Sequence, residues 1–221
     1  IDFMPRLFCL KKISYDEISV IIPHNLDKKF QEFIITICNL LEINEITFFK
    51  INSENLIHSF ENLIFTSNPG TLFAHTFFHK LLKNTIKKNK ERNLYVMRGS
   101  TINRKVLNEI DLIKLLQKYN YEFIDCATLS IEEQIKQFSE AKNIIIPSGA
   151  AITNLLFVPD KINVVEIRSN LDRIFSKLIN LNNRFNLYLF ENTIKLGWKL
   201  RQDIIVDIQK LKRLVEEKKL F

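Results

Sequence analysis

The stretch NIIIPSGAAITNLLFVPDKINVVEI, residues 143–167, contains two apolar runs separated by a turn of small residues and a further apolar segment. Residues 143–147 predict a buried strand and residues 163–167 a second strand. Between them, residues 150–157 predict a short helix that starts just after Ser148 and Gly149. A strand, a helix and a strand in this order are typical of a parallel sheet covered by helices. The stretch therefore predicts an α/β fold.

The rest of the chain alternates in the same way. Strands are predicted over residues 18–22, 45–51, 62–66, 94–97, 121–126 and 186–190, and helices over residues 27–41, 71–88, 108–119, 131–141, 172–181 and 203–218. Ser130 with Glu133 predicts a capping box at the start of one of these helices. The helix over 108–119 carries an apolar stripe at a spacing of three residues, formed by Ile110, Ile113, Leu116 and Tyr119.

The polar segment 87–92 interrupts this periodicity and predicts a domain boundary near residue 90. We expect an N-terminal lobe over residues 1–90 and a C-terminal lobe over residues 91–202, each with a parallel sheet. Residues 203–221 predict an amphipathic helix whose apolar face holds Ile204, Ile208, Leu211 and Val215. We expect this helix to pack back on the N-terminal lobe.

The composition is that of a globular chain with a basic surplus. Hydrophobic residues make up 46% of the sequence, the net charge is +7 and the pI is near 9.2. The charge favours nucleic acid, acidic lipid or phosphorylated small molecules as partners, although solvated helix faces explain most of the Lys and Arg residues. We find no nucleic-acid motif and no basic stripe with interleaved aromatics, so nucleic acid is not expected as a partner.

The cysteines and apolar runs bear on location. Cys9, Cys38 and Cys126 are odd in number and widely spaced, which predicts reduced core residues in a cytoplasmic protein. No apolar run reaches the roughly 20 residues that a membrane span requires, and no signal peptide is seen. Peripheral association with an anionic membrane stays open.

Parallel sheets bind ligands at the carboxyl ends of their strands. The Ser148-Gly149-Ala150 turn follows one such end, and a small turn entering a helix lets a phosphate approach backbone N–H groups. Similar turns also occur without any ligand. The sequence contains neither GxGxxG nor GxxxxGK[ST], so the standard dinucleotide and P-loop sites are not supported.

Three cations follow the strand over 94–97, namely Arg98, Arg104 and Lys105. The planar fork of arginine suits a diphosphate, because it offers parallel donors to two oxygens. The other interpretation is a solvated basic loop. Glu166 lies at the end of another strand, where it could accept hydrogen bonds from ribose hydroxyls or serve as the partner of a neighbouring Arg.

In chain order, these residues resemble two motifs of family 61 glycosyltransferases. The motif Y-x-x-R … R-R-x-x-N-E is matched by Tyr95, Arg98, Arg104, Lys105, Asn108 and Glu109. The motif H-G-A-x-x-x-N-x-x-F-x-P … v-v-E is matched, after Ser148, by Gly149, Ala150, Asn154, Phe157, Pro159 and Glu166. Residues 2–7, DFMPRL, are similar to the end of the family's H-W-x-x-[DE]-x-x-P-R-L, which predicts that the chain starts inside a motif and that its N-terminal lobe is truncated.

The resemblance implies a GT-B-like architecture with two Rossmann-like lobes facing a cleft. It also implies an inverting glycosyltransferase that moves a sugar from a UDP-sugar to a glycan or glycolipid acceptor, in capsule or lipopolysaccharide synthesis. Asp2 is the expected base. The expected donor-binding residues are Arg98, Arg104, Lys105, Asn108, Ser148, Gly149, Ala150, Asn154 and Glu166. No DxD motif is present, so neither a metal nor another cofactor is expected.

Two positions depart from the family pattern. Ser148 stands where the family has His, and Lys105 stands where it has the second Arg of a pair. The first change removes an imidazole, and the second keeps the charge without the bidentate geometry. An alternative function therefore stays open, namely a non-catalytic two-lobed module that binds a phosphorylated ligand.

Overall fold

The computed structural model describes residues 17–43, 45–52, 59–64, 92–99, 105–168, 180, 183–191, 193–196 and 203–221. The chain divides into two compact units, Ile1–Leu82 and Lys83–Phe221. The helix predicted over residues 71–88 lies outside the described residues, as does the helix predicted over residues 172–181 except for residue 180.

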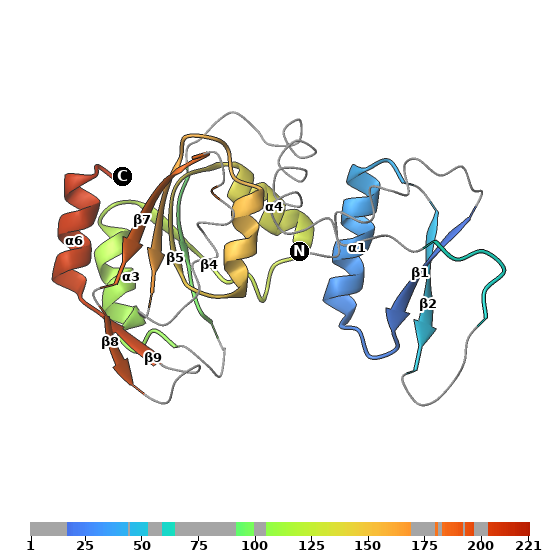
Figure 1. Ribbon diagram of the computed structural model, residues 1–221. Helices are drawn as coiled ribbons and strands as arrows, with labels where there is room; N and C mark the ends of the chain where they lie inside the picture. The colour runs from blue at the N-terminus through green and yellow to red at the C-terminus, as the bar shows by residue number, and fades with distance from the viewer. Residues whose placement is uncertain are drawn as a thin grey trace. The chain divides into compact units, whose positions relative to one another are not determined.

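The first unit contains a pair of parallel strands and a helix (Figure 1). Strand β1, Ile18–Pro23, pairs with β2, Ile46–Ile51, and helix α1, Lys28–Leu40, connects them. Asp27 caps the helix by accepting a hydrogen bond from the backbone N–H of Lys29 at 2.7 Å. The strand predicted over residues 62–66 is not found in its described part, 62–64.

The second unit is built on a five-stranded sheet in which all neighbouring strands pair in parallel, in the order β4-β3-β5-β6-β7. In chain order its elements begin with β3 (Arg92–Val96), α3 (Glu109–Gln117), β4 (Tyr121–Ile124), α4 (Ile131–Ser139), β5 (Ala141–Pro147), the 3₁₀ helix η2 (Ala150–Leu156), β6 (Asn163–Ile167) and β7 (Asn186–Phe190). The predicted α/β fold with a parallel sheet is thus confirmed.

The strand order reverses direction between β3 and β5. The chain passes from β3 to β4 at one edge and then crosses back to β5 on the other side of β3. Right-handed crossovers in opposite directions put their helices on opposite faces of a sheet. Accordingly, Figure 1 shows α3 on one side of the strands and α4 on the other.

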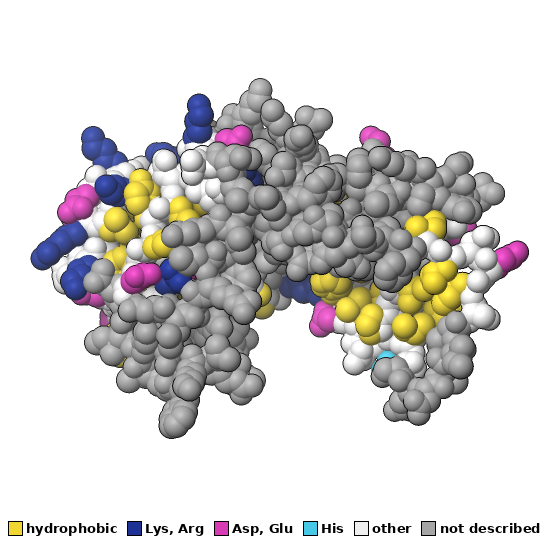
Figure 2. Space-filling model, in the orientation of Figure 1, with side chains coloured by type: hydrophobic (Ala, Val, Ile, Leu, Met, Phe, Trp, Pro, Cys, Tyr) yellow, Lys and Arg dark blue, Asp and Glu magenta, His cyan; other side chains and the backbone are white. Residues whose placement is uncertain are grey.

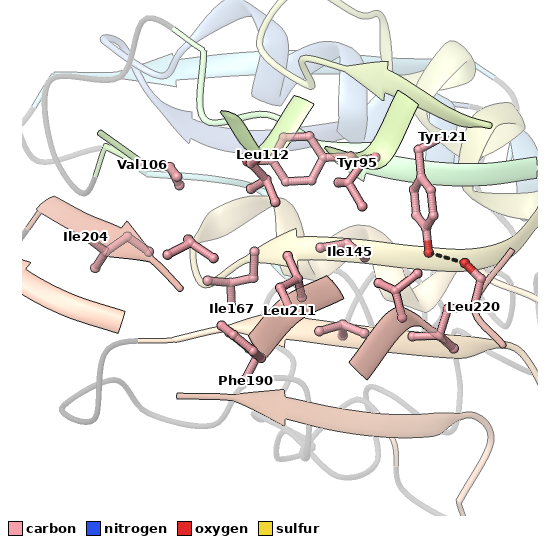
Figure 3. Close-up of a cluster of buried hydrophobic side chains, with 14 residues drawn as sticks. Tyr95, Val106, Leu112, Tyr121, Ile145, Ile167, Phe190, Ile204, Leu211 and Leu220 are labelled. Atoms are coloured by element: carbon pink, nitrogen blue, oxygen red, sulfur yellow. Dashed lines mark hydrogen bonds between the residues drawn. The ribbon is translucent and has the colours of Figure 1, made fainter. Parts of the chain in front are cut away.

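One face of this sheet is covered by α3 and by the last helix of the chain, α6 (Ile208–Glu217) (Figure 3). The core on this face consists of Tyr95, Val106, Leu112, Leu116, Tyr121, Ile145, Val165, Ile167, Phe190, Ile204, Val206, Leu211, Val215 and Leu220. Tyr121 donates a hydrogen bond from its hydroxyl to the carbonyl oxygen of Leu220 at 2.8 Å.

Helix α3 buries a different set of residues from the stripe noted in the sequence. Its buried residues are Leu112, Leu115 and Leu116, whereas Ile110 is 69% exposed. A stripe at strict three-residue spacing drifts around a helix of 3.6 residues per turn, so its two ends cannot face the same sheet.

The prediction of one helix over residues 203–218 is wrong. Residues Asp203–Val206 form β9, which pairs antiparallel with β8 (Thr193–Leu196), and α6 begins only after Asp207, which caps it. Ile204 and Val206 are buried and alternate with less buried neighbours, so this run has the period of a strand.

This C-terminal segment, which was expected to pack on the N-terminal lobe, has the apolar face of its helix within the second unit. Leu211 and Val215 of α6 are fully buried in the core of the second unit, together with Leu112 and Tyr95. Without α6, apolar side chains of α3 and of the sheet would be exposed to water. Their burial under α6 therefore favours this placement.

Charged side chains gather over the part of the second unit where α6 lies (Figure 2). Two of its lysines have acidic partners one turn away: Lys210 approaches Asp207 at 3.6 Å and Lys212 approaches Glu216 at 3.8 Å. This is the arrangement of a solvated helix face, as expected for most of the basic residues.

Four asparagines form a ladder across the amino-terminal part of the sheet. They occupy matching register positions on β3, β5, β6 and β7. Asn143 donates to Asn93 at 2.7 Å, Asn163 to Asn143 at 2.8 Å, and Asn186 to Asn163 at 2.9 Å. Asn143 is 1% exposed, so its amide depends on these partners for hydrogen bonding.

Candidate functional site

The candidate site lies where the strand order reverses, at the carboxyl ends of β3 and β5, which is where open parallel sheets bind ligands. Arg98 follows β3 and Gly149 follows β5. The Arg98 guanidinium lies against Gly149, because a Cβ built on residue 149 would overlap Arg98 Nη1 and come within 3.2 Å of Cζ. Two residues predicted separately from the sequence are thus brought together.

Glu109, in the first turn of α3, holds the end of β3. Its Oε1 accepts hydrogen bonds from the Tyr95 hydroxyl at 2.8 Å and from the backbone N–H of Arg98 at 3.2 Å. Tyr95 is fully buried, and burial together with the nearby Glu109 carboxylate raises the pKa of its hydroxyl far above the usual value. The phenol therefore stays protonated and acts as a donor to Glu109.

The backbone turns sharply directly after Arg98. Gly99 has a φ of +55°, and a Cβ there would overlap the carboxylate of Asp125. Asp125 lies just beyond β4, and its Oδ1 also accepts a hydrogen bond from the backbone N–H of Ala127 at 2.9 Å. Glycine is thus required both by the backbone and by the close approach of Asp125.

The turn after β5 is tied to the neighbouring strand. Ser148 is 6% exposed, and its backbone N–H donates to the carbonyl oxygen of Ile167 at 2.8 Å. Gly149 has extended backbone, so its small size serves the approach of Arg98 and not an unusual φ. The helix that follows is a 3₁₀ helix, whose short length gives it little dipole to offer an anion.

Asn154 belongs to the support of the turn. It is 6% exposed, and its Nδ2 donates to Gln134 Oε1 at 2.8 Å and to Cys126 Sγ at 3.6 Å. Gln134 in turn donates to the carbonyl oxygens of Cys126 at 3.0 Å and Leu129 at 3.3 Å. The amide of Asn154 therefore joins η2 to α4 and to the loop after β4, a contact that the sequence did not indicate.

Lys105 and Asn108 are held by β9. Asn108 exchanges two hydrogen bonds with the backbone of Val206, donating from Nδ2 at 2.8 Å and accepting at Oδ1 at 2.9 Å. The Lys105 backbone N–H donates to Asp203 Oδ1 at 2.7 Å, and its carbonyl accepts from Ile204 at 2.8 Å. The side chain of Lys105 is exposed, whereas the amide of Asn108 is committed to protein.

Glu166 is fully buried, and its carboxylate faces Arg168, with Oε1 3.9 Å from Nε. Arg168 is 3% exposed and also donates from Nη1 to Glu191 Oε1 at 3.0 Å. The interpretation of Glu166 as the partner of a neighbouring Arg agrees with this arrangement. A ribose contact by Glu166 would require its carboxylate to become accessible.

The remaining predicted site residues, Asp2 and Arg104, lie outside the described residues, as does Cys9. Among the described residues, Cys38 and Cys126 form no disulfide, and burial raises the pKa of Cys38 to about 11. Within the described ranges we find no group of three or more His, Cys, Asp or Glu residues that could hold a metal ion. No helix in the same part of the chain is long and apolar enough to cross a membrane.

Several residues of the site were missed from the sequence. Glu109 was part of a motif but had no assigned role, although an acidic residue at a helix start beside a strand end is a recognisable signal. Arg168 follows Glu166 by two positions, which puts both on the same face of a strand. Asp125 and Gln134 carry no signal that separates them from ordinary loop and helix residues.

A comparison with protein families identifies a match for this chain. The model of the family described as Glycosyltransferase 61 matches residues 1–165. The match includes both residues that meet at the site, Arg98 and Gly149, and ends within β6. A search of curated proteins found no match.

Proposed function

The chain belongs to glycosyltransferase family 61 and is therefore a glycosyltransferase, and on this premise we propose that it transfers a sugar from a UDP-sugar to a glycan or glycolipid acceptor with inversion. The proposed architecture is GT-B-like, with the donor on the second unit and the acceptor on the first.

One observation carries the donor site: the Arg98 guanidinium lies directly over Gly149, where β3 and β5 end side by side. A cation held over a turn at this edge suits a diphosphate, because arginine presents parallel N–H donors to two oxygens at once. Among the residues that the structure describes, neither Gly149 nor Ala150 uses its backbone N–H in a hydrogen bond, so both remain available as further donors.

Transfer with inversion needs stabilisation of the leaving diphosphate, alignment of the acceptor and a base for its hydroxyl proton. We assign the first task to Arg98 with the Gly149-Ala150 backbone, and we propose that Arg104 and Lys105 add positive charge from the same loop. Glu166, Asn108 and Asn154 are left out of the donor contacts, because the first is fully buried and the amides of the other two are bound within the protein.

Asp2 is the proposed base, as the resemblance of residues 2–7 to the family motif implies. A carboxylate takes the proton of the acceptor hydroxyl while the oxygen attacks the anomeric carbon, and the diphosphate leaves from the opposite face. Replacement of Asp2 by Asn should abolish transfer and leave UDP affinity within about twofold. Turnover retained in this variant would dismiss Asp2 as the base.

The donor site is tested by calorimetry with UDP as the probe. We expect Arg98→Ala to weaken UDP binding about tenfold or more, as for the loss of a charge-assisted hydrogen bond. Arg213→Ala is the matched control, since Arg213 is an exposed cation of α6. Equal UDP affinities for the wild-type protein and Arg98→Ala would remove Arg98 from the donor site.

A second experiment separates the proposed activity from the non-catalytic alternative. UDP-sugars are incubated with the protein, with and without glycan acceptors, and released UDP is measured. Release of UDP above that of the Arg98→Ala variant supports transfer or donor hydrolysis. Tight UDP binding without any release under all conditions would favour the alternative of a binding module, which the Ser148 change had suggested.

A further inference from the structure

We propose that Glu109 is a positioning residue for donor binding: it sets the backbone of Arg98 so that the guanidinium lies over Gly149. This inference rests on the proposed function of Arg98 as a diphosphate ligand. It concerns how that ligand is held and gives Glu109 no contact with the donor.

The first step is the geometry around the carboxylate. Glu109 lies at the start of α3, and a single oxygen, Oε1, accepts from both Tyr95 and the backbone of Arg98. The Tyr95 side chain is fully buried, with an exposed fraction of 0%. The carboxylate is therefore fixed at one side by a phenol that packing holds in place.

The second step is the position of Arg98 at the end of the sheet. The backbone N–H of Met97 still donates to Ile124 of the neighbouring β4 segment, at 2.8 Å. One residue later, the backbone N–H of Arg98 donates to Glu109 instead. The carboxylate thus sets the direction of the chain where the Arg98 side chain departs.

The third step is the limited space around the guanidinium of Arg98. The guanidinium occupies space that even a single methyl group on residue 149 would fill. A shift of the Arg98 backbone therefore moves the guanidinium either into the turn or away from it. Misplacement of a ligand group by about 1 Å is enough to lose most of its contribution.

The proposed role of Glu109 requires a side chain of sufficient length with an acceptor oxygen. It does not require a negative charge. Glutamine keeps both the length and an Oε1 that accepts two hydrogen bonds. Aspartate keeps the charge but is shorter by one methylene. We expect Glu109→Asp to weaken UDP binding about tenfold and Glu109→Gln to stay within about threefold of the wild type. Asp111→Asn, an exposed carboxylate of the same helix, is the matched control.

The decisive measurement is a double-mutant cycle with Arg98→Ala, using UDP binding by calorimetry. If Glu109 acts through Arg98, adding Glu109→Asp to Arg98→Ala should change affinity by less than about twofold. Additive losses would overturn the proposal, as would a Glu109→Gln variant that binds UDP as weakly as Glu109→Asp. Should Glu109→Asp not fold, Tyr95→Phe replaces it in the cycle, because it removes the other hydrogen bond to Oε1.

The single variant Arg98→Ala distinguishes a failure of the proposed donor site from a failure of the proposed role of Glu109. Unchanged UDP affinity in that variant contradicts the proposed donor site itself. Weakened affinity in Arg98→Ala, together with wild-type affinity in Glu109→Asp, contradicts only the positioning role. The KM for the acceptor gives a further check. Because Glu109 is proposed to position only a donor-binding side chain, its variants should keep this KM within about twofold of the wild-type value.

Discussion

The guanidinium of Arg98 fills the space next to Gly149 that a Cβ at this position would need. The size of residue 149 and the position of the cation are therefore linked. The backbone of Gly149 is extended, so alanine is not excluded by its φ. This separates the steric effect on Arg98 from any cost of backbone strain.

Gly149→Ala should therefore weaken UDP binding about tenfold by displacing Arg98, while the midpoint of thermal unfolding changes little. Calorimetry with UDP and a thermal melt measure the two effects. On the Arg98→Ala background, the same substitution should have almost no further effect on affinity, because the clash is gone. A full additional loss there would mean that Gly149 acts independently of Arg98.

Asn154→Ala should act on stability and not directly on UDP binding. It leaves the buried Oε1 of Gln134 without its donor, which costs about 1–3 kcal/mol in unfolding free energy. Urea denaturation measures this loss, and UDP affinity measured below the unfolding transition should stay within about twofold. A large loss of affinity with unchanged stability would restore Asn154 as a phosphate contact.

The asparagine ladder predicts a graded response along the sheet. Asn143→Leu removes the donor to Oδ1 of the buried Asn93 and the acceptor of Nδ2 of the half-buried Asn163, and should cost about 2 kcal/mol or more. Asn186→Ala, at the exposed end of the ladder, should cost less than about 1 kcal/mol. Chemical denaturation of both variants measures the two losses of unfolding free energy. Equal losses would contradict the graded response.

The Arg92–Glu122 ion pair predicts a pH dependence of stability. The hydrogen bond from Arg92 lowers the pKa of Glu122 below its ordinary value of 4.5. A lowered carboxyl pKa contributes stability above the ordinary pKa, and this contribution is lost as the pH falls through the folded-state value. Glu122→Gln should thus cost at most about 1 kcal/mol near neutral pH, since the Glu122 side chain is 47% exposed.

The measurement is urea denaturation of the wild type and Glu122→Gln across the acid range. The difference between the two unfolding free energies should shrink once the pH falls below about 4.5. A difference that stays constant from neutral to acid pH would assign the effect to packing of the side chain.

Much of the sheet could be predicted because its strands are marked locally. The apolar runs at β6 and β7 gave both strands with their observed bounds. Ser130 with Glu133 predicted the capping box, which the structure confirms with hydrogen bonds of 3.1 and 2.7 Å. Local signals of this kind depend on neighbours in the sequence and need no knowledge of the fold.

The errors arise where distant parts of the chain decide the structure. Ile204 fits a helical face together with Leu211, but pairing with β8 and with Lys105 makes it a strand residue. Asn108 and Asn154 are polar residues in a ligand-binding motif, yet their partners, Val206 and Gln134, could be identified only from the structure. Spacing along the chain contains no information on such partners.

The attachment of residues 105–108 to β9 also has a consequence for how the protein acquires its site. Asp203 binds the backbone of Lys105 across 98 positions of sequence. During synthesis, domains gain structure from the N-terminus onward, at roughly 5–20 residues per second. All five strands of the sheet precede β9 in the chain, so the backbone of Lys105 gains this anchor only after β9 has been synthesised. A nascent chain stopped before Asp203 would carry the five strands of the sheet, but it would lack both this anchor and the α6 side chains that cover one face of the sheet.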